Sequence, residues 1–416
     1  MLKTSISPAR SSNRVSTDAP GAPRTLLISD RYLPDIGGSF TWFDNVYRRH
    51  RAGSVWIVTN RYPNAGDVDA NFPQIRMVRT TLKRYRFLKP ESLLLYMKLL
   101  FWCSWVILRH RIQVIHASKN MPEGYMARIL SRIWRVPYVV YAHGEEITVF
   151  MRNPKLAPHQ PKIYGDAAAV IANSGFTAGL VKDLGVPEDR IARISPGVDP
   201  DVFAPAPPSA AMRQKYGLDA GKIHVLTVGR LQRRKGHDRV IEAMPEILRQ
   251  APNVVYVIAG DGEERSSLEA LARATGVAEH VRFLGRVPQE DLPALYNTCD
   301  LFLMANRTMP DGDVEGFGIV FLEAGACLRP AIAGNSGGTA DAVEDGVNGF
   351  QVDGESLASI STAVVRLALD PALRQRMGEA GRKKVLERYT WDGITERIVA
   401  VSKGVVHGTN ERKTRK

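Results

Sequence analysis

Short apolar runs alternate with helical stretches along this chain, in two successive series. The first series opens with TLLIS at residues 25–29, and the second opens with VLTV at residues 225–228. Continuous runs rich in Val, Ile and Leu are typical of strands that are buried on both faces of a parallel sheet. Two such series in 416 residues predict an α/β protein with two Rossmann-like domains. The other expected strands are residues 55–59, 114–116, 138–142 and 170–173, then 254–259, 281–284, 301–304 and 331–333.

The two series also divide the chain into expected segments. Residues 1–24 are rich in Ser, Pro, Arg and Ala and lack the apolar stretch of a secretory signal, so we expect a disordered leader there. A proline-rich segment close to residue 205 separates the two series. We therefore expect a first domain at residues 25–204, a second domain at residues 205–389 and a basic tail at residues 405–416.

The net charge of +13 is concentrated in the first half of the chain. Residues 1–200 contain 28 Lys and Arg against 15 Asp and Glu, whereas the remainder contains 28 against 28. The segment from Arg76 to Arg111 is basic and aromatic, and its apolar run, Leu99 to Leu108, has about half the length that a bilayer crossing needs. This composition favours contact with an anionic membrane surface. A buried helix with a solvated basic flank is the alternative.

Two other classes of partner and site are disfavoured. No nucleic-acid-reading motif accompanies the basic residues, so we do not expect nucleic acid as a partner. The three cysteines, Cys103, Cys299 and Cys327, fit neither a disulfide framework nor a metal site. We expect a cytoplasmic protein, either free or peripheral on the inner face of the cytoplasmic membrane.

Polar motifs follow two strands of the first series. Ligands of such sheets bind at the carboxyl ends of the strands. Gly37 and Gly38 follow the first strand, where paired glycines permit a tight turn whose amides suit a phosphate or a sugar. His143 follows residues 138–142, where its imidazole can exchange a hydrogen bond with a substrate hydroxyl. An ordinary glycine turn and a structural hydrogen bond at the strand end are the respective alternatives.

Basic residues follow the first strand of the second series. Arg230 and Lys235 flank a loop that leads into a helix. Two fixed cations at a helix start can clamp a diphosphate and neutralise the charge that grows as it leaves. A solvated basic loop is the alternative, and Arg233 and Arg234 stay unassigned. Further along, Val287 lies in a loop that either holds a nucleobase through backbone groups or is a plain turn.

Two glutamates, Glu315 and Glu323, stand eight positions apart around an expected helix start. Gly316 and Gly318 follow the first of them and let backbone N–H groups approach a ligand closely. Two acids so placed can grip two sets of sugar hydroxyls on one phosphorylated ligand. The alternative is that the macrodipole favours acids in a helix's first turn, by about 0.3–1 kcal/mol, without any ligand.

The order of these motifs resembles that of the retaining glycosyltransferases of family 4. The resemblance covers about residues 25–400, and the phrase DVEGFGIVFLEA at residues 313–324 is similar to that of bacterial mannosyltransferases acting on phosphatidylinositol mannosides. It implies the GT-B fold, in which two Rossmann-like domains face a central cleft and a helix near residues 390–404 crosses back to the first domain. The motifs that carry it are Gly37-Gly38, His143, Arg230 with Lys235, Glu315-x7-Glu323 and Ser336-Gly337-Gly338.

The resemblance implies roles for these residues. Arg230 and Lys235 would bind the donor diphosphate and stabilise it as the leaving group, while His143 would lie beside the reacting sugar. Glu315 would contact the hydroxyls of the transferred sugar, and Glu323 would contact the ribose. The backbone groups expected to approach the donor are those of Gly37, Gly38, Val287, Gly318, Ile319 and Val320.

The predicted activity is retaining transfer of a hexose from a nucleotide sugar to a lipid-linked or polysaccharide hydroxyl. GDP-mannose is favoured over a UDP-hexose as donor. The family works without metal, so we interpret Asp311-x-Asp313 as a chance match and expect no cofactor. The loop from Arg307 to Asp313 is longer than in many relatives and is expected to shape the donor or acceptor pocket. The alternatives are a nucleotide-sugar epimerase of the same fold and a non-catalytic GT-B subunit.

Overall fold

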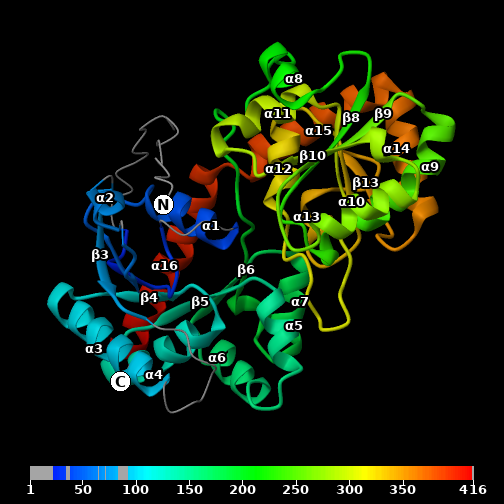
Figure 1. Ribbon diagram of the computed structural model, residues 1–416. Helices are drawn as coiled ribbons and strands as arrows, with labels where there is room; N and C mark the ends of the chain where they lie inside the picture. The colour runs from blue at the N-terminus through cyan, green and yellow to red at the C-terminus, as the bar shows by residue number, and fades with distance from the viewer. Residues whose placement is uncertain (1–21, 34–37, 64, 71, 83–91, 415–416) are drawn as a thin grey trace. The chain divides into compact units, whose positions relative to one another are not determined.

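The computed structural model describes residues 22–33, 38–63, 65–70, 72–82 and 92–414. These residues form two compact units (Figure 1). The first unit contains the described residues up to Pro196 together with those from Trp391 onwards, and the second unit is Gly197–Thr390. Each unit has one parallel β-sheet between helices, so the expected α/β class with two Rossmann-like domains is confirmed.

The sheet of the first unit has seven strands in the order β3-β2-β1-β4-β5-β6-β7. The strand order reverses at β1, which pairs in parallel with β2 on one side and with β4 on the other. Leu27 of β1 lies opposite Ile57 of β2 and His116 of β4. The strands are β1 (Thr25–Ile28), β2 (Val55–Asn60), β3 (Ile75–Thr80), β4 (Val114–Ala117), β5 (Tyr138–Ala142), β6 (Ala169–Ala172) and β7 (Ile191–Arg193).

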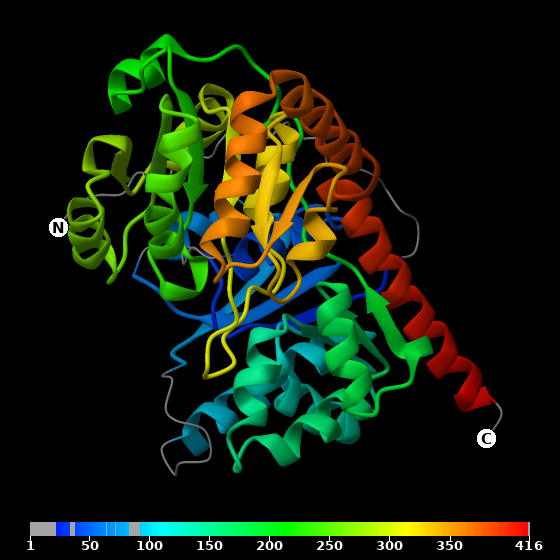
Figure 2. The same cartoon turned by 90° about the vertical axis from the view of Figure 1, so that its right-hand side faces the viewer.

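Helices cover both faces of this sheet, because successive side chains of each strand point to opposite faces. Leu26 and Ile28 pack into a core with α3 and α4, whereas Leu27 packs into a second core with α1 and α16. Figure 2 shows the length of α16, the red helix that ends at the C-terminus. The helices are α1 (Gly38–Tyr47), α2 (Ala65–Ala70), α3 (Ser92–His110), η1 (Asn120–Gly124), α4 (Tyr125–Trp134), α5 (Glu145–Met151), η2 (Ala157–His159), α6 (Gln160–Gly165), α7 (Gly175–Asp183), η3 (Glu188–Arg190) and α16 (Trp391–Thr414).

The sheet of the second unit has six parallel strands in the order β10-β9-β8-β11-β12-β13. Here the order reverses between β8 and β11, so ligand-binding loops are expected after these two strands. The strands are β8 (Ile223–Val228), β9 (Val254–Ala259), β10 (Val281–Gly285), β11 (Leu301–Met304), β12 (Ala331–Gly334) and β13 (Gly349–Val352). The helices are α8 (Ala210–Tyr216), η4 (Arg233–Lys235), α9 (His237–Gln250), α10 (Arg265–Ala274), η5 (Ala278–His280), η6 (Gln289–Asp291), α11 (Leu292–Thr298), α12 (Ile319–Ala326), α13 (Thr339–Ala342), α14 (Leu357–Leu369) and α15 (Pro371–Arg388).

Every strand expected from the apolar runs is present, but three observed strands were not expected. These are β3, β7 and β13, and each of them lies at an edge of its sheet. An edge strand is covered less completely, so it needs no continuous apolar run: β3 reads IRMVRT and β7 is only IAR. The buried-strand pattern therefore identifies the inner strands and passes over polar or very short ones.

The two units also begin and end at positions that differ from the expected segments. The second unit starts at Gly197 rather than at residue 205, because Val198 N–H donates to the carbonyl of Tyr389 at 2.8 Å. The last helix, α16, continues to Thr414, through most of the expected basic tail, since Val405 and Val406 still pack against the core of the first unit. The expected leader lies outside the described residues, except for residues 22–24.

Helix α3 is nearly twice as long as the apolar run from Leu99 to Leu108 that it contains. By length and composition it is the single described helix that could cross a membrane, although a third of it is buried in the first unit. Its buried side chains, such as Leu99 and Val106, face the core with α4. Large apolar side chains on its other face are 45–64% exposed. This α3 apolar stripe consists of Leu93, Leu94, Met97, Phe101, Trp105 and Leu108.

Candidate functional site

A carboxylate at the carboxyl edge of the second unit's sheet receives three hydrogen-bond donors. Glu315 lies in the loop between β11 and α12, and its Oε2 accepts from Arg234 Nη1 at 2.8 Å and from Asn306 Nδ2 at 3.3 Å. The ammonium of Lys235 contacts the same oxygen. The other oxygen, Oε1, makes no hydrogen bond within the described residues. One half of the carboxylate is therefore fixed by the protein, and the other half is available to a ligand.

Two close backbone approaches hold this arrangement together. Gly236 ends η4 with φ +73°, and a Cβ there would lie 2.0 Å from the carbonyl oxygen of Ala305. Gly337 has φ +62°, and a Cβ there would lie 2.0 Å from the carbonyl oxygen of Glu315, which also accepts from Gly338 N–H at 2.8 Å. Only glycine fits such approaches. They bring the basic turn and the Ser336-Gly337-Gly338 motif against the loop that carries Glu315.

The electrostatics of this cluster leave Glu315 ionised. Burial raises the pKa of its carboxyl, but the charges of Lys235 and Arg234 outweigh burial and lower that pKa to about 2. The pKa of Lys235 is also lowered, because burial and the charges of Arg234 and Arg230 outweigh its attraction to Glu315. The two directions are compatible, since one carboxylate is shared by several cations. The cluster is an anion surrounded by surplus positive charge, which favours a further anion as ligand.

The structure distinguishes the basic residues of η4 and its flank, which the sequence could not. Arg234, which was unassigned, is buried and bridges two carboxylates, with Nε 3.2 Å from Asp313 and Nη1 on Glu315. Arg230, which the sequence assigns to a diphosphate, is exposed, and its positive charge contributes to the lowered pKa of Lys235. Arg233 is exposed as well. No local signal separates the three arginines, because which one points inward depends on the geometry of the turn.

The second glutamate of the motif has a different environment. Glu323 lies in α12, and its Oε2 accepts a hydrogen bond from the hydroxyl of Tyr296 at 2.8 Å. Burial raises the pKa of Glu323 to about 7, although the hydrogen bond from Tyr296 lowers it. No cation is paired with this carboxyl among the described residues. The two glutamates of the motif therefore differ in charge state near neutral pH.

The start of α12 presents backbone donors beside Glu315. Gly318 precedes the helix with φ +89°, and a Cβ there would lie 2.6 Å from the ring of Phe321. Ile319 and Val320 are the first two helical residues, and the first N–H groups of a helix have no intrahelical acceptor. Val287 lies elsewhere, after edge strand β10, and is half-buried. The helix start thus suits an anion, whereas Val287 lies at the edge of the sheet, away from this helix start in the order of the strands.

In the first unit, His143 lies at the carboxyl end of β5, as expected. Its Nε2 donates to the carbonyl of Ser118 at 2.8 Å, and its ring packs edge-on against Trp42 and Phe43. This is the structural hydrogen bond that the sequence left open as the alternative. With Nε2 engaged, Nδ1 is the ring nitrogen left to accept from a hydroxyl. Gly38 begins α1, whereas Gly37 lies outside the described residues.

The same edge of the first unit carries a buried acid cluster that the sequence did not identify. Glu123 is fully buried, accepts from Asp30 N–H at 2.9 Å and lies 3.9 Å from the ammonium of Lys119. Lys119 pairs with Asp30 at 3.2 Å. Burial, followed by the charge of Asp30, raises the pKa of Glu123 to about 8. Asp30 and Lys119 follow the expected strands closely, so their strand-end positions were the available signal.

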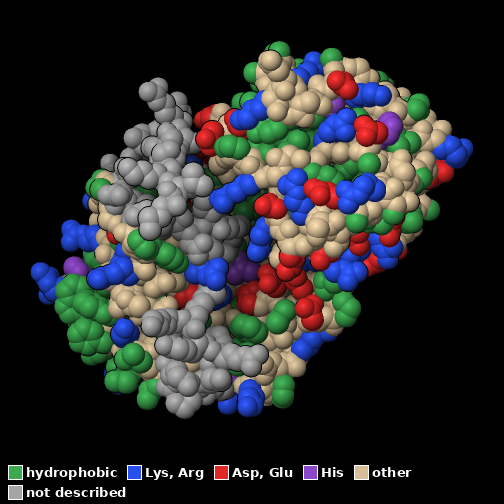
Figure 3. Space-filling model, viewed as in Figure 1, with side chains coloured by type: hydrophobic (Ala, Val, Ile, Leu, Met, Phe, Trp, Pro, Cys, Tyr) green, Lys and Arg blue, Asp and Glu red, His purple; other side chains and the backbone are tan. Residues whose placement is uncertain are grey.

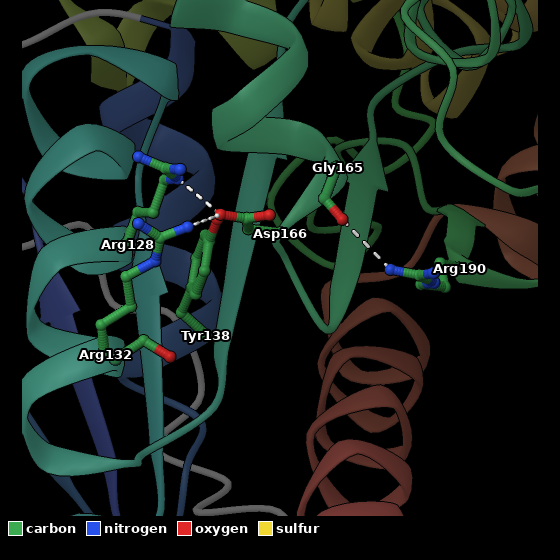
Figure 4. A pocket seen from close by; sticks show the side chains of 7 residues that line it. Arg128, Arg132, Tyr138, Gly165, Asp166 and Arg190 are labelled. Carbon is green, nitrogen blue, oxygen red and sulfur yellow. Dashed lines mark hydrogen bonds and ion pairs between the residues drawn. The ribbon is translucent and has the colours of Figure 1, made fainter.

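A cavity of the first unit lies at the opposite edge of its sheet (Figure 4). Its lining comes from the ends of α4 and α6 and from the amino ends of the strands, such as Tyr138, the first residue of β5. Arg128 and Arg132 both pair with one oxygen of Asp166, at 2.6 and 2.8 Å. These ion pairs tie α4 to the segment before β6. The cavity is thus separate from the strand-end residues, and it has the features of a structural contact.

No group of three or more His, Cys, Asp or Glu side chains is arranged to hold a metal in the part of the chain that the structure describes. In the Asp311-x-Asp313 sequence, one oxygen of Asp313 is paired with the guanidinium of Arg234. Asp311 instead accepts from the backbone N–H of Asp313 at 3.0 Å. The three cysteines are buried free thiols.

Comparisons with known proteins agree with this architecture. Residues 36–202 match the family model described as Glycosyltransferase Family 4, and residues 209–384 match Glycosyl transferases group 1. A GDP-mannose-dependent alpha-(1-6)-phosphatidylinositol monomannoside mannosyltransferase of Mycolicibacterium smegmatis is 37% identical over 71% of this chain and 77% of its own length. A GDP-mannose-dependent monoacylated alpha-(1-6)-phosphatidylinositol monomannoside mannosyltransferase of Corynebacterium glutamicum is 30% identical over 91% of this chain and 97% of its own.

Solved structures with lower sequence identity share the fold. The sucrose-phosphate synthase of Thermosynechococcus elongatus has a TM-score of 0.77 at 22% identity, over 92% of this chain and 99% of its own. Anabaena HepE in complex with UDP-glucose has a TM-score of 0.75 at 22% identity, over 92% and 100%. Both support the GT-B fold. With the family matches over both units and the relatives at 30% identity or more, the chain belongs to the glycosyltransferases of family 4.

Proposed function

We propose that this protein is a retaining mannosyltransferase that uses GDP-mannose and a lipid-linked or glycan hydroxyl acceptor. Membership of the family makes it a hexosyltransferase that uses a nucleotide-sugar donor. The choice of mannose and of a phosphatidylinositol-type acceptor is supported by the names of the relatives that are 30–38% identical. The observation that carries the proposal is the ionised Glu315 among surplus cations, since a nucleotide sugar offers both hydroxyls and a diphosphate.

The cations are assigned to the diphosphate. Arg230 is exposed and Lys235 lies beside it, so both can receive phosphate oxygens. The charge of the diphosphate grows when the bond from C1 of the sugar to its oxygen breaks, and fixed cations stabilise that charge. The amides of Gly318, Ile319 and Val320 would add backbone donors to the same phosphates.

Glu315 is assigned to binding rather than to nucleophilic attack. A carboxylate whose pKa is about 2, with one oxygen held by three donors, is a weak nucleophile but a permanent acceptor for sugar hydroxyls. Retention then follows a front-face route. The acceptor oxygen bonds to C1 on the side from which the diphosphate leaves, and the acceptor's proton passes to the diphosphate oxygen. Glu323 would accept from the ribose hydroxyls.

The remaining assignments follow the strand-end positions of each unit. His143 would accept from a hydroxyl of the reacting sugar through Nδ1, and Gly37 or Gly38 would approach the distal phosphate. Val287 would contact the base through its backbone. These assignments rest on the family resemblance together with the positions of His143 after β5, Gly38 at the start of α1 and Val287 after β10.

A panel of nucleotide sugars tests the function. The protein is incubated with each donor, with and without a phosphatidylinositol-type acceptor, and both the sugar product and the free nucleoside diphosphate are measured. Transfer from GDP-mannose with retained configuration is the expected result, with slow release of GDP when the acceptor is absent. Conversion of the donor into a new nucleotide sugar would contradict transfer and favour an epimerase. Binding without any turnover would favour a non-catalytic subunit.

We further propose that the α3 apolar stripe lies on the anionic inner surface of the cytoplasmic membrane. The stripe covers an arc of roughly 120° of the helix, and the green side chains at the lower left of Figure 3 lie over α3. Exposed Arg109 and Arg111 follow it directly, and the chain's excess of positive charge lies in this half. Apolar and basic groups together match an interface of acyl chains and anionic headgroups.

Vesicle flotation tests the membrane contact. Phe101→Ser combined with Trp105→Ser should lower the fraction bound to anionic vesicles about tenfold or more, because each buried aromatic side chain contributes about 1.5–3 kcal/mol. Leu369→Ser with Leu386→Ser is the matched control, since these side chains of the second unit are 60% and 50% exposed. Equal flotation of the two variants, or equal recovery of the unmodified protein with neutral vesicles, would contradict the proposal.

A further inference from the structure

The loop between β11 and α12 contains a second carboxylate with one unengaged oxygen. Asp313 Oδ2 lies 3.2 Å from Nε of Arg234. Its Oδ1 is buried and has no hydrogen-bond donor among the described residues. Leaving a buried carboxylate oxygen without a donor costs free energy, so such a group at a ligand-binding edge indicates a donor that the ligand brings.

Asp313 and Glu315 are arranged alike around one guanidinium. Arg234 uses Nε for Asp313 and Nη1 for Glu315, so each carboxylate gives one oxygen to the arginine. Each of them retains a second oxygen, Oδ1 or Oε1, that takes no donor from the described protein. Arg234 is itself buried, with a side chain that is 10% exposed, and it therefore cannot release either carboxylate to solvent without losing a buried ion pair.

The loop that carries Asp313 is fixed at several points. Arg307, at its start, pairs with Asp238 at 2.8 Å and donates its backbone N–H to the carbonyl of Arg234 at 2.9 Å. Thr308 exchanges a hydrogen bond with Ser336 at 3.0 Å. Asp313 is thus positioned by the fold before any ligand arrives, which is what a specificity-determining group requires.

We propose that Asp313 is a specificity-determining residue that accepts a hydrogen bond from one hydroxyl of the transferred sugar. Glu315 accepts from another hydroxyl, and Arg234 is the positioning residue for both carboxylates. The inference rests on the proposed function, because it needs a sugar nucleotide at this edge of the second unit. In this proposal, the hydrogen bonds that Asp313 and Glu315 accept determine which sugar the protein transfers.

Donors that lack single hydroxyl groups test the inference. GDP-mannose and its 2-, 3-, 4- and 6-deoxy analogues are compared as substrates of the unmodified protein and of Asp313→Ala, with kcat/KM as the measure. With GDP-mannose, the variant should lose on the order of 10- to 100-fold, as expected for one hydrogen bond to a charged acceptor. With one of the deoxy donors, the variant and the unmodified protein should agree within about twofold, since the hydroxyl that Asp313 binds is already absent.

A second variant and a matched control complete the experiment. Asp313→Asn should lose less activity than Asp313→Ala, because Arg234 can retain the amide oxygen while the amide nitrogen donates to the oxygen of the sugar hydroxyl. Glu246→Ala should leave kcat/KM within about twofold, since its exposed side chain bonds only Arg249 and Gln250 in α9 within the described part of the chain. Thermal unfolding identifies variants that do not fold.

The outcomes separate the inference from the proposed function. Turnover of GDP-mannose by the unmodified protein supports the mannosyltransferase proposal by itself. Equal losses of Asp313→Ala with all five donors would overturn the role of Asp313, because they would show that it is only a counter-ion of Arg234. Activity that is abolished by a chelator and restored by Mg²⁺ would also overturn it, by showing that Asp311 and Asp313 hold a metal.

Discussion

Replacing Glu323 by Gln should stabilise the protein at alkaline pH while weakening donor binding. The buried carboxyl of Glu323 has a pKa of about 7 against an ordinary value of 4.5, and burial is the main cause. At a pH above 7 the fold therefore holds an anion that the unfolded chain would solvate better. Gln is isosteric, remains neutral and can still accept the hydrogen bond from Tyr296. The substitution thus removes the cost of ionisation without removing the contact.

The magnitude follows from the difference between the folded and unfolded pKa values. Raising the pKa from 4.5 to about 7 corresponds to about 3 kcal/mol of lost stability once the pH exceeds both values. This is an upper value, because residue Glu323 is half-buried rather than fully enclosed. Between the two pKa values the folded protein binds more protons than the unfolded chain, so stability falls as the pH rises. At about pH 5 the cost is below about 1 kcal/mol.

Urea unfolding at about pH 5 and about pH 8.5 measures this difference. Glu323→Gln should gain up to about 3 kcal/mol relative to the unmodified protein at the higher pH, and little at the lower pH. Glu315→Gln is the contrasting control. The folded pKa of Glu315 is about 2, so its ionised form stabilises the fold at every pH above 4.5 and that contribution disappears only as the pH falls towards 2. Its variant should lose about 3 kcal/mol or more at both pH values.

Donor binding supplies the functional half of the same experiment. The ribose hydroxyls that we propose to donate to Glu323 bind a carboxylate more strongly than a neutral acid. The affinity of the unmodified protein for GDP should therefore fall as the pH drops below 7, and Glu323→Gln should abolish that dependence. A gain in stability by Glu323→Gln that is equal at both pH values would refute the reasoning, because it would show that the carboxyl is not buried as an anion.

Two further results are expected. Lys235→Met should lower kcat on the order of 100-fold or more, with a smaller effect on the donor KM, because it removes the charge that we assign to the leaving diphosphate. The control Arg233→Met replaces an exposed side chain and should change neither kcat nor KM by more than about twofold in steady-state kinetics. Ser402→Ala should lower the free energy of unfolding by about 1–3 kcal/mol, because the fully buried His116 donates from Nε2 to the hydroxyl of Ser402 in α16 at 3.0 Å. Thermal or urea unfolding measures this loss, and the double variant with His116→Phe should lose less than the sum of the two single variants.

The sequence predicts the inner strands well because their signal is local. A strand that is covered on both faces must be apolar at every position, so VLTV and VVYVIA are recognisable without knowledge of their neighbours. The same reasoning cannot find an edge strand such as β3, whose middle residues are only partly buried. It also underestimates α3, because Lys98 divides the apolar sequence of this helix and the run counted from Leu99 is only its second part.

The candidate site is predictable in its positions and not in its partners. Strand-end reasoning brings Lys235 and Glu315 together, since the loops after parallel strands meet at one edge of a sheet. It does not find that Arg234, which the sequence leaves unassigned, holds Glu315, because the inward direction of this side chain is set by the turn that ends at Gly236. Nor does it find the partner of Glu123, because Asp30 is 93 residues away in sequence.

The contrast between the two glutamates of the motif has a structural origin that spacing does not encode. Glu315 is ionised because η4, some 80 residues earlier in the chain, brings two cations to it. Glu323 has a pKa near neutral because burial raises it, the hydroxyl of Tyr296 in α11 lowers it only in part, and no cation is paired with it among the described residues. The motif therefore gives one acceptor whose charge is fixed by the fold and one whose charge responds to what binds. Since a ribose hydroxyl favours the ionised form, arrival of the nucleotide near neutral pH should drive a proton from Glu323 while leaving Glu315 unchanged.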